Sequence, residues 1–329
     1  MSQPSHRPGR LGVGVISAGR VGAVLGAALR GAGHAVVGVH ASSEASRERA
    51  ATLLPDVPVL DVQSIVERSE LVLLAVPDDQ LPGLVSGLAA TGAWQPGQLV
   101  VHTAGRHGTG VLEPVRAAGG IGLAVHPAMT FTGLSLDLQR LADCSFGVTA
   151  AAPVLPIAQA LVVEMGAEPV VVAEADHPLY HAALAHGSNH VMTVLGESMQ
   201  LLGEIGVEHP DRVLGPLVRA TVDNALASGE NALTGPVARG DVTTVAAHVA
   251  ALRELAGGGA RAGHDAAGPV GSADHDAAGP TGNADHDAAR QLLAGYRALA
   301  RQTARRAAAS GRLDETSYRA VMAAIEEEQ

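Results

Sequence analysis

The sequence predicts an α/β protein in which a doubly wound parallel sheet precedes an all-helical domain. Short apolar runs alternate with helical stretches from Leu11 to about Ala175, and a glycine turn joins the first run to the first helix. After Ala175 the helical periodicity continues without a strand-like run. The 329 residues suit two domains of about 150 residues each. We therefore expect the first domain over residues 11–175.

The first elements form a βαβ unit. Residues 11–16 are expected to be a strand, 17–19 a turn, 20–31 a helix with small residues on one face, and 35–40 a second strand. Later apolar runs predict five further strands, at 71–76, 99–102, 121–126, 146–149 and 169–173, with a helix at 156–165 between the last two. Strands that alternate with helices in this way form a parallel sheet, which binds its ligands at the carboxyl ends of the strands.

The second domain is expected to be helical over residues 176–255 and again over 290–328, in two helices at 290–310 and 313–328. Between these parts, an eleven-residue unit that begins at His264 recurs at His275, and a third copy starts at His286. A Gly-Pro pair in each full copy rules out a continuous helix, so residues 256–289 are interpreted as a flexible linker. Its His-Asp pairs could instead bind a metal, but nothing would fix their geometry. Residues 1–10 are expected to be disordered.

Composition excludes several classes of function. The net charge is −11 and no basic run is present, which disfavours binding to nucleic acid or to an anionic membrane. No lysine occurs, which excludes a Schiff-base lysine, a lysine general acid and the lysine of a Walker phosphate loop. Cys144 is the only cysteine, so an intramolecular disulfide and a multi-cysteine metal site are excluded. Without an apolar run long enough to span a bilayer, we expect a soluble cytoplasmic protein.

The most informative motif is the glycine turn after the first strand. A dinucleotide-binding turn has the pattern G-x-G-x-x-G between a strand and a helix, where the pyrophosphate meets the start of the helix. The residues in this place are Ser17, Ala18, Gly19, Arg20, Val21 and Gly22. Gly19 and Gly22 hold the second and third glycine positions, and Ser17 replaces the first. We interpret the motif as a dinucleotide site; the alternative is a tight structural turn without a ligand.

The end of the second strand favours NADP(H) over NAD(H). NAD-specific sites usually place an acidic residue there, on the ribose hydroxyls. Here Ser42 and Ser43 follow the strand, and Arg47 and Arg49 lie just beyond. Hydroxyls and arginines suit a 2′-phosphate. Alternatively, the two serines cap the next helix and Arg47 is a surface charge.

Polar residues also follow the next three strands. Val76, Pro77 and Asp78 come after the third strand and Thr103 after the fourth, where they would lie beside the nicotinamide half of a bound cofactor. His126 stands at the end of the fifth strand. It could donate a proton to a substrate oxygen, or it could be a structural residue bonded to a nearby loop.

The helical domain offers two candidate patches. His181 and Ser188 are seven residues apart and share a helix face, with Asn189 adjacent, so they line a cleft or anchor a neighbouring helix. The second patch contains Thr234, Arg239 and Asp241. Arg239 could clamp a substrate carboxylate while Asp241 orients it, or Asp241 could be only the N-cap of the following helix.

Taken in order, these motifs resemble one family. They are Gly19-x-x-Gly22, Val76-Pro77-Asp78, His126-Pro127, Tyr180-His181-Ala182-Ala183, Ser188-Asn189, and the run from Ala232 to Asp241 that reads Ala-Leu-Thr-Gly-Pro-Val-Ala-Arg-Gly-Asp. The family is the Rossmann-like proteins whose C-terminal helical domain is the domain of unknown function 2520. Its architecture is similar to that of pyrroline-5-carboxylate reductases, ketopantoate reductases and 6-phosphogluconate dehydrogenase-like enzymes.

The resemblance implies an NADP-binding domain, an all-helical second domain and a substrate cleft between them, but it supplies no substrate. Ser17 departs from the family pattern and could tighten the approach to the pyrophosphate. Ketopantoate reductases and β-hydroxyacid dehydrogenases typically use a lysine at this cleft, which this chain lacks. A ketone would therefore take its proton from His181 or His126, with Asn189 and Ser188 holding the oxygen. A protonated imine would need no enzymic acid.

We therefore expect an NADP-dependent oxidoreductase acting on a small carboxylate-bearing ketone, alcohol or imine. In it, His181 handles the proton, Asn189 orients the substrate and Arg239 holds the carboxylate. The competing interpretation is a non-catalytic NADPH sensor or regulatory module. Helical second domains of this superfamily often pair, so a homodimer is expected.

Overall fold

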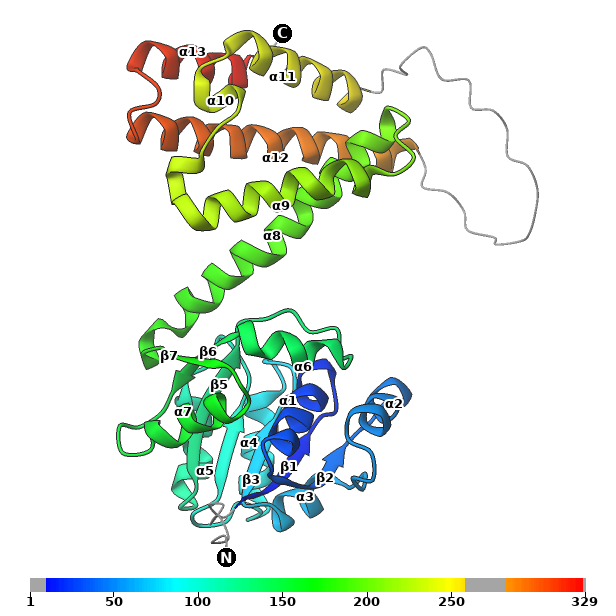
Figure 1. Ribbon diagram of the computed structural model, residues 1–329, viewed down its shortest axis with the longest axis vertical. Coiled ribbons are helices and arrows are strands. Elements are labelled where there is room, and N and C mark those ends of the chain that lie inside the picture. The colour runs from blue at the N-terminus through cyan, green and yellow to red at the C-terminus, as the bar shows by residue number, and fades with distance from the viewer. Residues whose placement is uncertain (1–9, 258–281, 328–329) are drawn as a thin grey trace, which may run out of the picture. The chain divides into compact units, whose positions relative to one another are not determined.

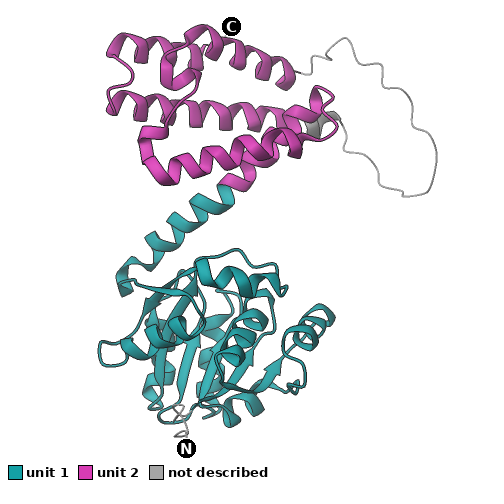
Figure 2. Cartoon of the chain, viewed as in Figure 1, with its two compact units in different colours: residues 1–190 teal, residues 191–329 magenta. Residues whose placement is uncertain are grey.

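The computed structural model describes residues 10–257 and 282–327, except for the side chains of 282–286. The chain divides into two compact units, residues 1–190 and 191–329 (Figure 2). The division falls inside one long helix, α8 (His177–Glu204). The first turns of α8 therefore belong with the sheet, although the sequence placed the domain boundary at 175/176.

The first unit is built on a seven-stranded sheet (Figure 1). Its strands are β1 (Gly12–Ile16), β2 (Ala35–His40), β3 (Leu71–Leu74), β4 (Leu99–His102), β5 (Ile121–Pro127), β6 (Ser145–Thr149) and β7 (Glu168–Val171), in the order β2-β1-β3-β4-β5-β6-β7. All seven expected strands are present, and the doubly wound sheet is confirmed. The strand order reverses between β1 and β3, which is the place where such sheets bind a nucleotide.

One strand pair departs from the expected parallel arrangement. β5 and β6 are antiparallel, whereas β6 and β7 are parallel to each other. A parallel crossover needs a dozen or more residues, usually with a helix that covers the sheet. The connection from β5 to β6, residues 128–144, has that length, but it contains only the short helix α6 (Leu136–Arg140) and the 3-10 turn η2 (Leu141–Asp143) and no longer helix. The chain therefore returns along the sheet in the opposite direction.

Helices cover both faces of the sheet. Alternate strand residues such as Val13 and Val15 pack with α1 (Arg20–Gly31), α2 (Glu44–Leu53) and α7 (Leu155–Glu164). Residues of the opposite pleat, such as Ile16 and Val72, pack with α3 (Val62–Arg68), α4 (Leu81–Ala90) and α5 (Glu113–Ala117). The turns η1 (Thr109–Leu112) and η3 (Glu174–Asp176) complete the unit. Both pleats are buried, as expected for a central parallel sheet.

The described part of the second unit is helical. After α8 come α9 (Pro210–Ser228), the turn η4 (Gly229–Ala232), α10 (Pro236–Arg239), α11 (Val242–Ala256), α12 (Gly282–Ala309) and α13 (Glu315–Glu326). Its core uses small residues: Ala300, Ala304 and Ala307 share one face of α12 and pack with Val245 and Val321. Small side chains allow the helix axes to approach closely.

Helix α12 begins earlier than expected. It starts at Gly282, so the third copy of the repeat, from His286, is helical rather than part of a linker. That copy lacks the Gly-Pro pair of the first two, because Arg290 and Gln291 stand in its place. The remainder of the expected linker, residues 258–281, and the expected disordered residues 1–9 lie outside the described part of the chain.

Large apolar side chains are exposed along α8 and α9 beyond residue 190. α9 has no buried residue, and in α8 only His177 is buried. The exposed apolar residues are Val191, Met192, Val194, Met199, Val213, Leu217, Val222 and Leu226. Within the described residues, no helix is long and apolar enough to cross a membrane.

Candidate functional site

The glycine turn has the geometry of a dinucleotide-binding turn. Ser17 has a φ of 79°, so it keeps the left-handed conformation for which glycine is the usual residue. A Cβ at Gly22 would lie 2.1 Å from the carbonyl oxygen of Ser17 and 2.9 Å from the Cβ of Ala75. Gly22 therefore lets α1 approach β1 closely, as the third glycine of the motif does.

The start of α1 is open to an anion. Gly19 occupies the N-cap, no side chain caps the helix, and its first turn has no acidic residue. A Cβ at Gly19 would meet only the Ser17 hydroxyl within 4 Å, at 3.5 Å. A helix N-terminus with free space before it suits a pyrophosphate. The residues present therefore fit a dinucleotide. The Ser17 hydroxyl would lie beside the path by which the pyrophosphate reaches the start of α1.

Arginines surround the end of β2. Ser43 caps α2, because its hydroxyl accepts a hydrogen bond from the Ser46 N–H at 3.2 Å. Arg47 is exposed and donates to the Ser42 carbonyl at 3.1 Å. Arg49 donates to the Ala18 carbonyl at 3.0 Å and so reaches the glycine turn itself. Ser43 thus has the capping role that was the alternative interpretation. Arg47 is exposed, so its guanidinium can still meet a ligand from the solvent.

The segments after β3 and β4 lie side by side. The Thr103 N–H donates to the Leu74 carbonyl at 3.2 Å, which ties the end of β4 to the end of β3. Val76 is half-buried beyond that point, and the Pro77 carbonyl accepts from Gln80 and Leu81 at the start of α4.

Asp78 lies next to the loop after β4. Its carbonyl accepts a hydrogen bond from His107 Nε2 at 3.2 Å, and its carboxylate lies 4.0 Å from Arg106. The segments after β3 and β4 are therefore linked at two levels, at Thr103 and at Asp78. They form one wall at the edge of the sheet where ligands bind.

A histidine cluster lies around Gly105. A Cβ at Gly105 would lie 2.7 Å from His181 Cδ2 and 2.8 Å from His126 Nε2, so both rings converge on this glycine. The two ring centroids are 6.1 Å apart with an interplanar angle of 85°. His126 comes from the end of β5 and His181 from the second turn of α8. The structure thus brings together two histidines that are 55 residues apart in the sequence.

The predicted residues of α8 line one pocket with His126. The pocket has a volume of about 230 Å³ and is formed within the first unit. Its lining residues are His126, Pro127, Ala128, Met129, Thr130, His181, Leu184, Ala185, Ser188 and Asn189. The polar stripe of α8 therefore lines a pocket, which was one of the two roles expected for it.

Two further residues belong to this cluster that the sequence analysis did not predict as functional residues. The Tyr180 hydroxyl lies 3.0 Å from His126 Nδ1. His177 is buried, with Nδ1 3.0 Å from the Gly105 carbonyl and Nε2 2.8 Å from the Thr149 hydroxyl. His177 directly follows η3 and lies one helical turn before His181, and Tyr180 is the residue next to His181; these positions were the only sequence signal.

Burial lowers the pKa of two histidines in and near this cluster. It is the main cause that lowers the pKa of His126 to about 4; His181 and His177 also lower it, and Asp78 opposes them. Burial likewise lowers the pKa of His102 to about 4. Both imidazoles are therefore neutral at pH 7. A neutral imidazole offers one N–H donor and one acceptor.

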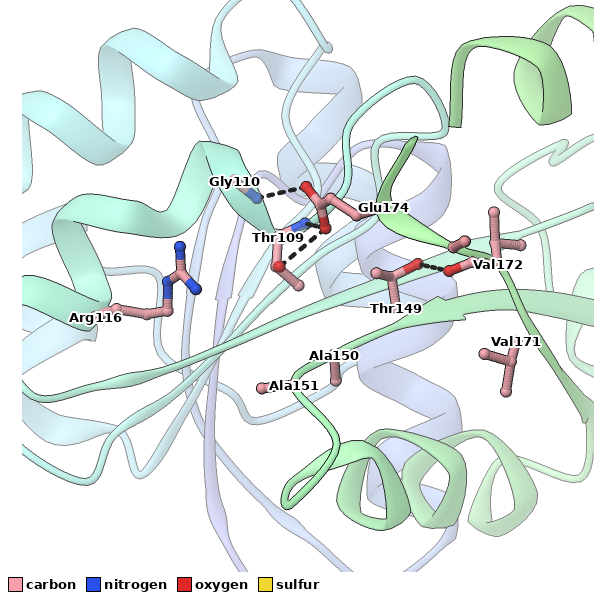
Figure 3. Close-up of a pocket in the computed structure, with 10 residues that line it drawn as sticks. Thr109, Gly110, Arg116, Thr149, Ala150, Ala151, Val171, Val172 and Glu174 are labelled. Atoms are coloured by element: carbon pink, nitrogen blue, oxygen red, sulfur yellow. Dashed lines mark hydrogen bonds between the residues drawn. The ribbon is translucent and has the colours of Figure 1, made fainter. Parts of the chain in front are cut away.

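A larger pocket of about 390 Å³ lies beside η1 and β7 (Figure 3). The Glu174 carboxylate accepts from the backbone N–H groups of Thr109 and Gly110, both at 2.8 Å, and from the Thr109 hydroxyl at 3.0 Å. The Arg116 guanidinium pairs with Glu113, and the Thr149 hydroxyl bonds to the Val172 carbonyl. These polar groups already have partners, so the pocket offers little to a polar ligand despite its size.

The second predicted patch lies in the other unit. Asp241 caps α11, because it accepts from the Thr244 N–H at 3.0 Å and from the Thr244 hydroxyl at 2.7 Å. Arg239 is exposed, with Nη1 3.5 Å from the Thr234 hydroxyl. Thr234 also lines a pocket of about 540 Å³ with Glu230 and Arg306. The capping alternative thus describes Asp241. Among the described residues, no group of three or more side chains could hold a metal ion.

The sequence matches two family models. Residues 1–127 match the Rossmann-like domain, and residues 144–261 match the domain of unknown function DUF2520. These matches confirm the resemblance that the motifs indicated. No curated protein matches the chain.

Solved structures share the fold. A candidate NADP oxidoreductase from Bacteroides fragilis has a TM-score of 0.62 at 20% identity, over 74% of this chain and 92% of its own. An imine reductase from a Pseudomonas species has a TM-score of 0.52 at 18% identity, over 74% and 85%. Pyrroline carboxylate reductase from Plasmodium falciparum, solved with NADP bound, has a TM-score of 0.50 at 12% identity, over 69% and 86%. At these identities the likeness establishes the fold.

Proposed function

From its Rossmann-like domain followed by a DUF2520 domain, we propose that this protein is an NADP(H)-dependent oxidoreductase. It would transfer a hydride between the nicotinamide and a small carboxylate-bearing ketone, alcohol or imine. The observation that carries this proposal is the pocket that joins His126, His181, Ser188 and Asn189 in the unit that also holds the glycine turn. The names of the similar structures, an NADP oxidoreductase, an imine reductase and a pyrroline carboxylate reductase, support it.

The chain's own residues would hold the cofactor at three places. The turn from Ser17 to Gly22 would bind the pyrophosphate at the start of α1. Ser42 and Arg47 would hold the 2′-phosphate, and Arg47 would supply the charge-assisted hydrogen bonds. Ser43, proposed with them from the sequence, keeps the capping role that its hydrogen bonds describe. Val76, Pro77, Asp78 and Thr103 would lie beside the nicotinamide. NADP(H), when bound, supplies the hydride.

The pocket residues would handle the substrate. His181 is half-buried and forms no hydrogen bond to the described part of the chain, so its ring nitrogens are free to exchange a proton. Ser188 and Asn189, on the same helix, would orient the reacting oxygen or nitrogen. Arg239 remains the proposed ligand of a substrate carboxylate, together with the Thr234 hydroxyl. We assign Asp241 only the capping role that its hydrogen bonds describe.

The direct test screens the protein with NADPH against a panel of 2-oxo acids and cyclic imines, following NADPH absorbance. His181→Ala should lower kcat on the best substrate by about 10²-fold or more, because a positioned general acid contributes that much. His190→Ala, an exposed histidine on the same helix, is the matched control and should keep its kcat. Unchanged turnover in His181→Ala would remove that residue from the mechanism. NADPH binding without turnover of any compound would favour a sensor.

The exposed apolar side chains of α8 and α9 favour a homodimer. These eight large side chains would be costly to leave in water, and exposed apolar surface of this kind commonly marks an interface. Most soluble oligomers are symmetric homo-oligomers, so a second copy of this chain is the proposed occupant.

A further inference from the structure

Tyr180 and His126 form a pair that none of the predicted roles uses. His126 ends β5, and Tyr180 lies in the first turn of α8, with its hydroxyl 3.0 Å from His126 Nδ1. The rings meet edge to face at 89°. A Cβ at Gly147 of β6 would lie 2.7 Å from the Tyr180 hydroxyl oxygen, so this glycine leaves room for the phenol. The pair is thus held by three separate elements.

The direction of this hydrogen bond follows from the two partners. Burial raises the pKa of Tyr180, while the backbone N–H of Gly147 acts on the phenol oxygen and lowers it; the net change is a rise. The phenol therefore keeps its proton at neutral pH. Among the described residues, His126 Nδ1 is the only acceptor within hydrogen-bond distance of the Tyr180 hydroxyl, so the hydroxyl proton points to His126 Nδ1. Since His126 is neutral at pH 7, its own proton must then be on Nε2.

The Nε2 atom of His126 lies toward Gly105, and the His126 side chain lines the pocket. Nε2 lies 2.8 Å from the position that a Cβ on Gly105 would take, and it makes no hydrogen bond within the described residues. The titratable groups that influence His126 are His181 and His177 of α8 and Asp78 after β3. Because Nε2 carries the proton, His126 offers a donor and no acceptor at this point.

We propose that Tyr180 fixes His126 as a neutral Nε2–H donor that holds an sp² oxygen of the substrate, either a carbonyl or a carboxylate. The identity of that oxygen rests on the proposed function, but the tautomer does not. A neutral imidazole is a poor acid, so His126 orients and polarises the oxygen while His181 exchanges the proton. The protonated nitrogen of an iminium ion is itself a hydrogen-bond donor, so it could not bond to the Nε2–H group of His126. A substrate imine would have to present its carboxylate there instead.

The tautomer is measured directly by NMR on the full-length protein labelled with ¹⁵N-histidine. Two-bond ¹H–¹⁵N correlations distinguish a protonated from an unprotonated ring nitrogen, and His126→Gln identifies the signals by their loss. At pH 7 we expect Nδ1 to be unprotonated and Nε2 protonated in the wild type, and this preference to be lost in Tyr180→Phe. A proton on Nδ1 in the wild type would overturn the proposal. This experiment needs no substrate, so its outcome is independent of the proposed function.

A double-mutant cycle tests the role toward the substrate. Tyr180→Phe should lower kcat/KM about tenfold, as expected for a buried hydrogen bond worth about 1.4 kcal/mol. In a His126→Ala background the same change should cause no further loss, because its effect acts through the imidazole. Tyr318→Phe, at a half-buried position on α13, is the control and should be unaffected. Losses that simply multiply would show that Tyr180 does not act through His126.

Discussion

At the residue scale, the histidines of the first unit differ in what their ring nitrogens already bind. In His102 both nitrogens are used, by the Gly108 carbonyl at 2.9 Å and the Ala104 N–H at 3.2 Å. In His177 both are used as well, and this residue holds Gly105 in place between the two remaining rings. Within the described residues, His126 Nε2 and the ring nitrogens of His181 have no hydrogen-bond partner, and both side chains line the pocket. Of these four histidines, we therefore propose these two as the ones that meet a substrate, His126 as a donor and His181 as a proton carrier.

Arg47 should determine the preference for the cofactor phosphate. Removing its guanidinium in Arg47→Ala should weaken NADPH binding at least tenfold, because hydrogen bonds between charged groups are worth about 1.5–3 kcal/mol. NADH lacks the 2′-phosphate, so its Kd should change less than about twofold. Isothermal titration of both cofactors measures this difference.

Arg68→Ala is the control for that prediction. Arg68 is exposed at the end of α3, in the same unit, and Arg68→Ala also removes one positive charge. Its NADPH Kd should stay unchanged. Equal weakening of NADPH and NADH in Arg47→Ala would place this arginine outside the phosphate site.

The sequence singled out four of the ten residues that line the pocket, because their positions follow simple spacing. His181 and Ser188 are two helical turns apart, and His126 ends an obvious strand. Tyr180 could not be assigned in the same way, because its partner is 54 residues away on a strand whose neighbour runs antiparallel. Its function depends on contacts with Gly147 and His126 that no local pattern encodes.

At the element scale, Glu174 fastens the connection between β7 and α8 to the start of η1. Burial opposes its ionisation, but the bonds from Gly110 and Thr109 outweigh this and lower its pKa below the ordinary 4.5. Its contribution to stability is therefore present above that value and is lost as the pH falls through the lower, folded-state pKa.

Glu174→Ala should lower the free energy of unfolding by about 1 kcal/mol at pH 7, allowing for solvent screening. The difference from the wild type should shrink as the pH falls below about 4.5 and vanish once the wild-type carboxylate is protonated. Trp94 is the only tryptophan and is buried in the first unit, so its fluorescence reports urea unfolding there. A difference that persists unchanged at low pH would show that the carboxylate charge is not the cause.

Asp241 should act as a helix cap. Asp241→Ala removes the acceptor for the Thr244 N–H and should lower the Tm followed by circular dichroism by a few degrees. Asp241→Asn keeps an acceptor oxygen and should restore most of the loss. Neither variant should change KM for a substrate. A raised KM with an unchanged Tm would return Asp241 to the substrate site.

Periodicity located the strands but not their direction or every boundary. All seven strands follow apolar runs, and α1 has the bounds that its pattern predicted. The antiparallel return of β6 depends on how little helix lies in the preceding connection, which a strand pattern does not reveal. The early start of α12 was visible in the sequence, because the third repeat copy lacks its Gly-Pro pair, but the repeat was interpreted as a whole.

At the scale of the whole molecule, α8 contributes to both units. Its residues up to His190 carry the pocket, and its later residues carry exposed apolar side chains. The sequence placed the boundary before this helix, because the change from strands to helices occurs there. The boundary between the two compact units depends instead on tertiary contacts. These contacts place the first turns of α8 in the same unit as the sheet.

The exposed apolar side chains of α8 and α9 predict the oligomeric state. Sedimentation equilibrium should give twice the mass of one chain. The side chain of Leu226 is 83% exposed, and the variant Leu226→Asp, which places a charge there, should shift the protein toward the monomer. Val163→Asp makes the same change at a 60%-exposed position on α7 and should leave the dimer intact. A monomeric wild type would require another occupant for this apolar surface.

The measurement that tests the central claim most directly is a titration of the purified protein with NADPH and, separately, with NADH, followed by nicotinamide fluorescence. The glycine turn and the arginines beside β2 predict saturable binding of both forms, with NADPH at least tenfold tighter. Tighter binding of NADH would contradict the assignment of Ser42 and Arg47 to the 2′-phosphate. Binding of neither would mean that Ser17 closes the pyrophosphate site, and the protein would not be a nicotinamide-dependent oxidoreductase.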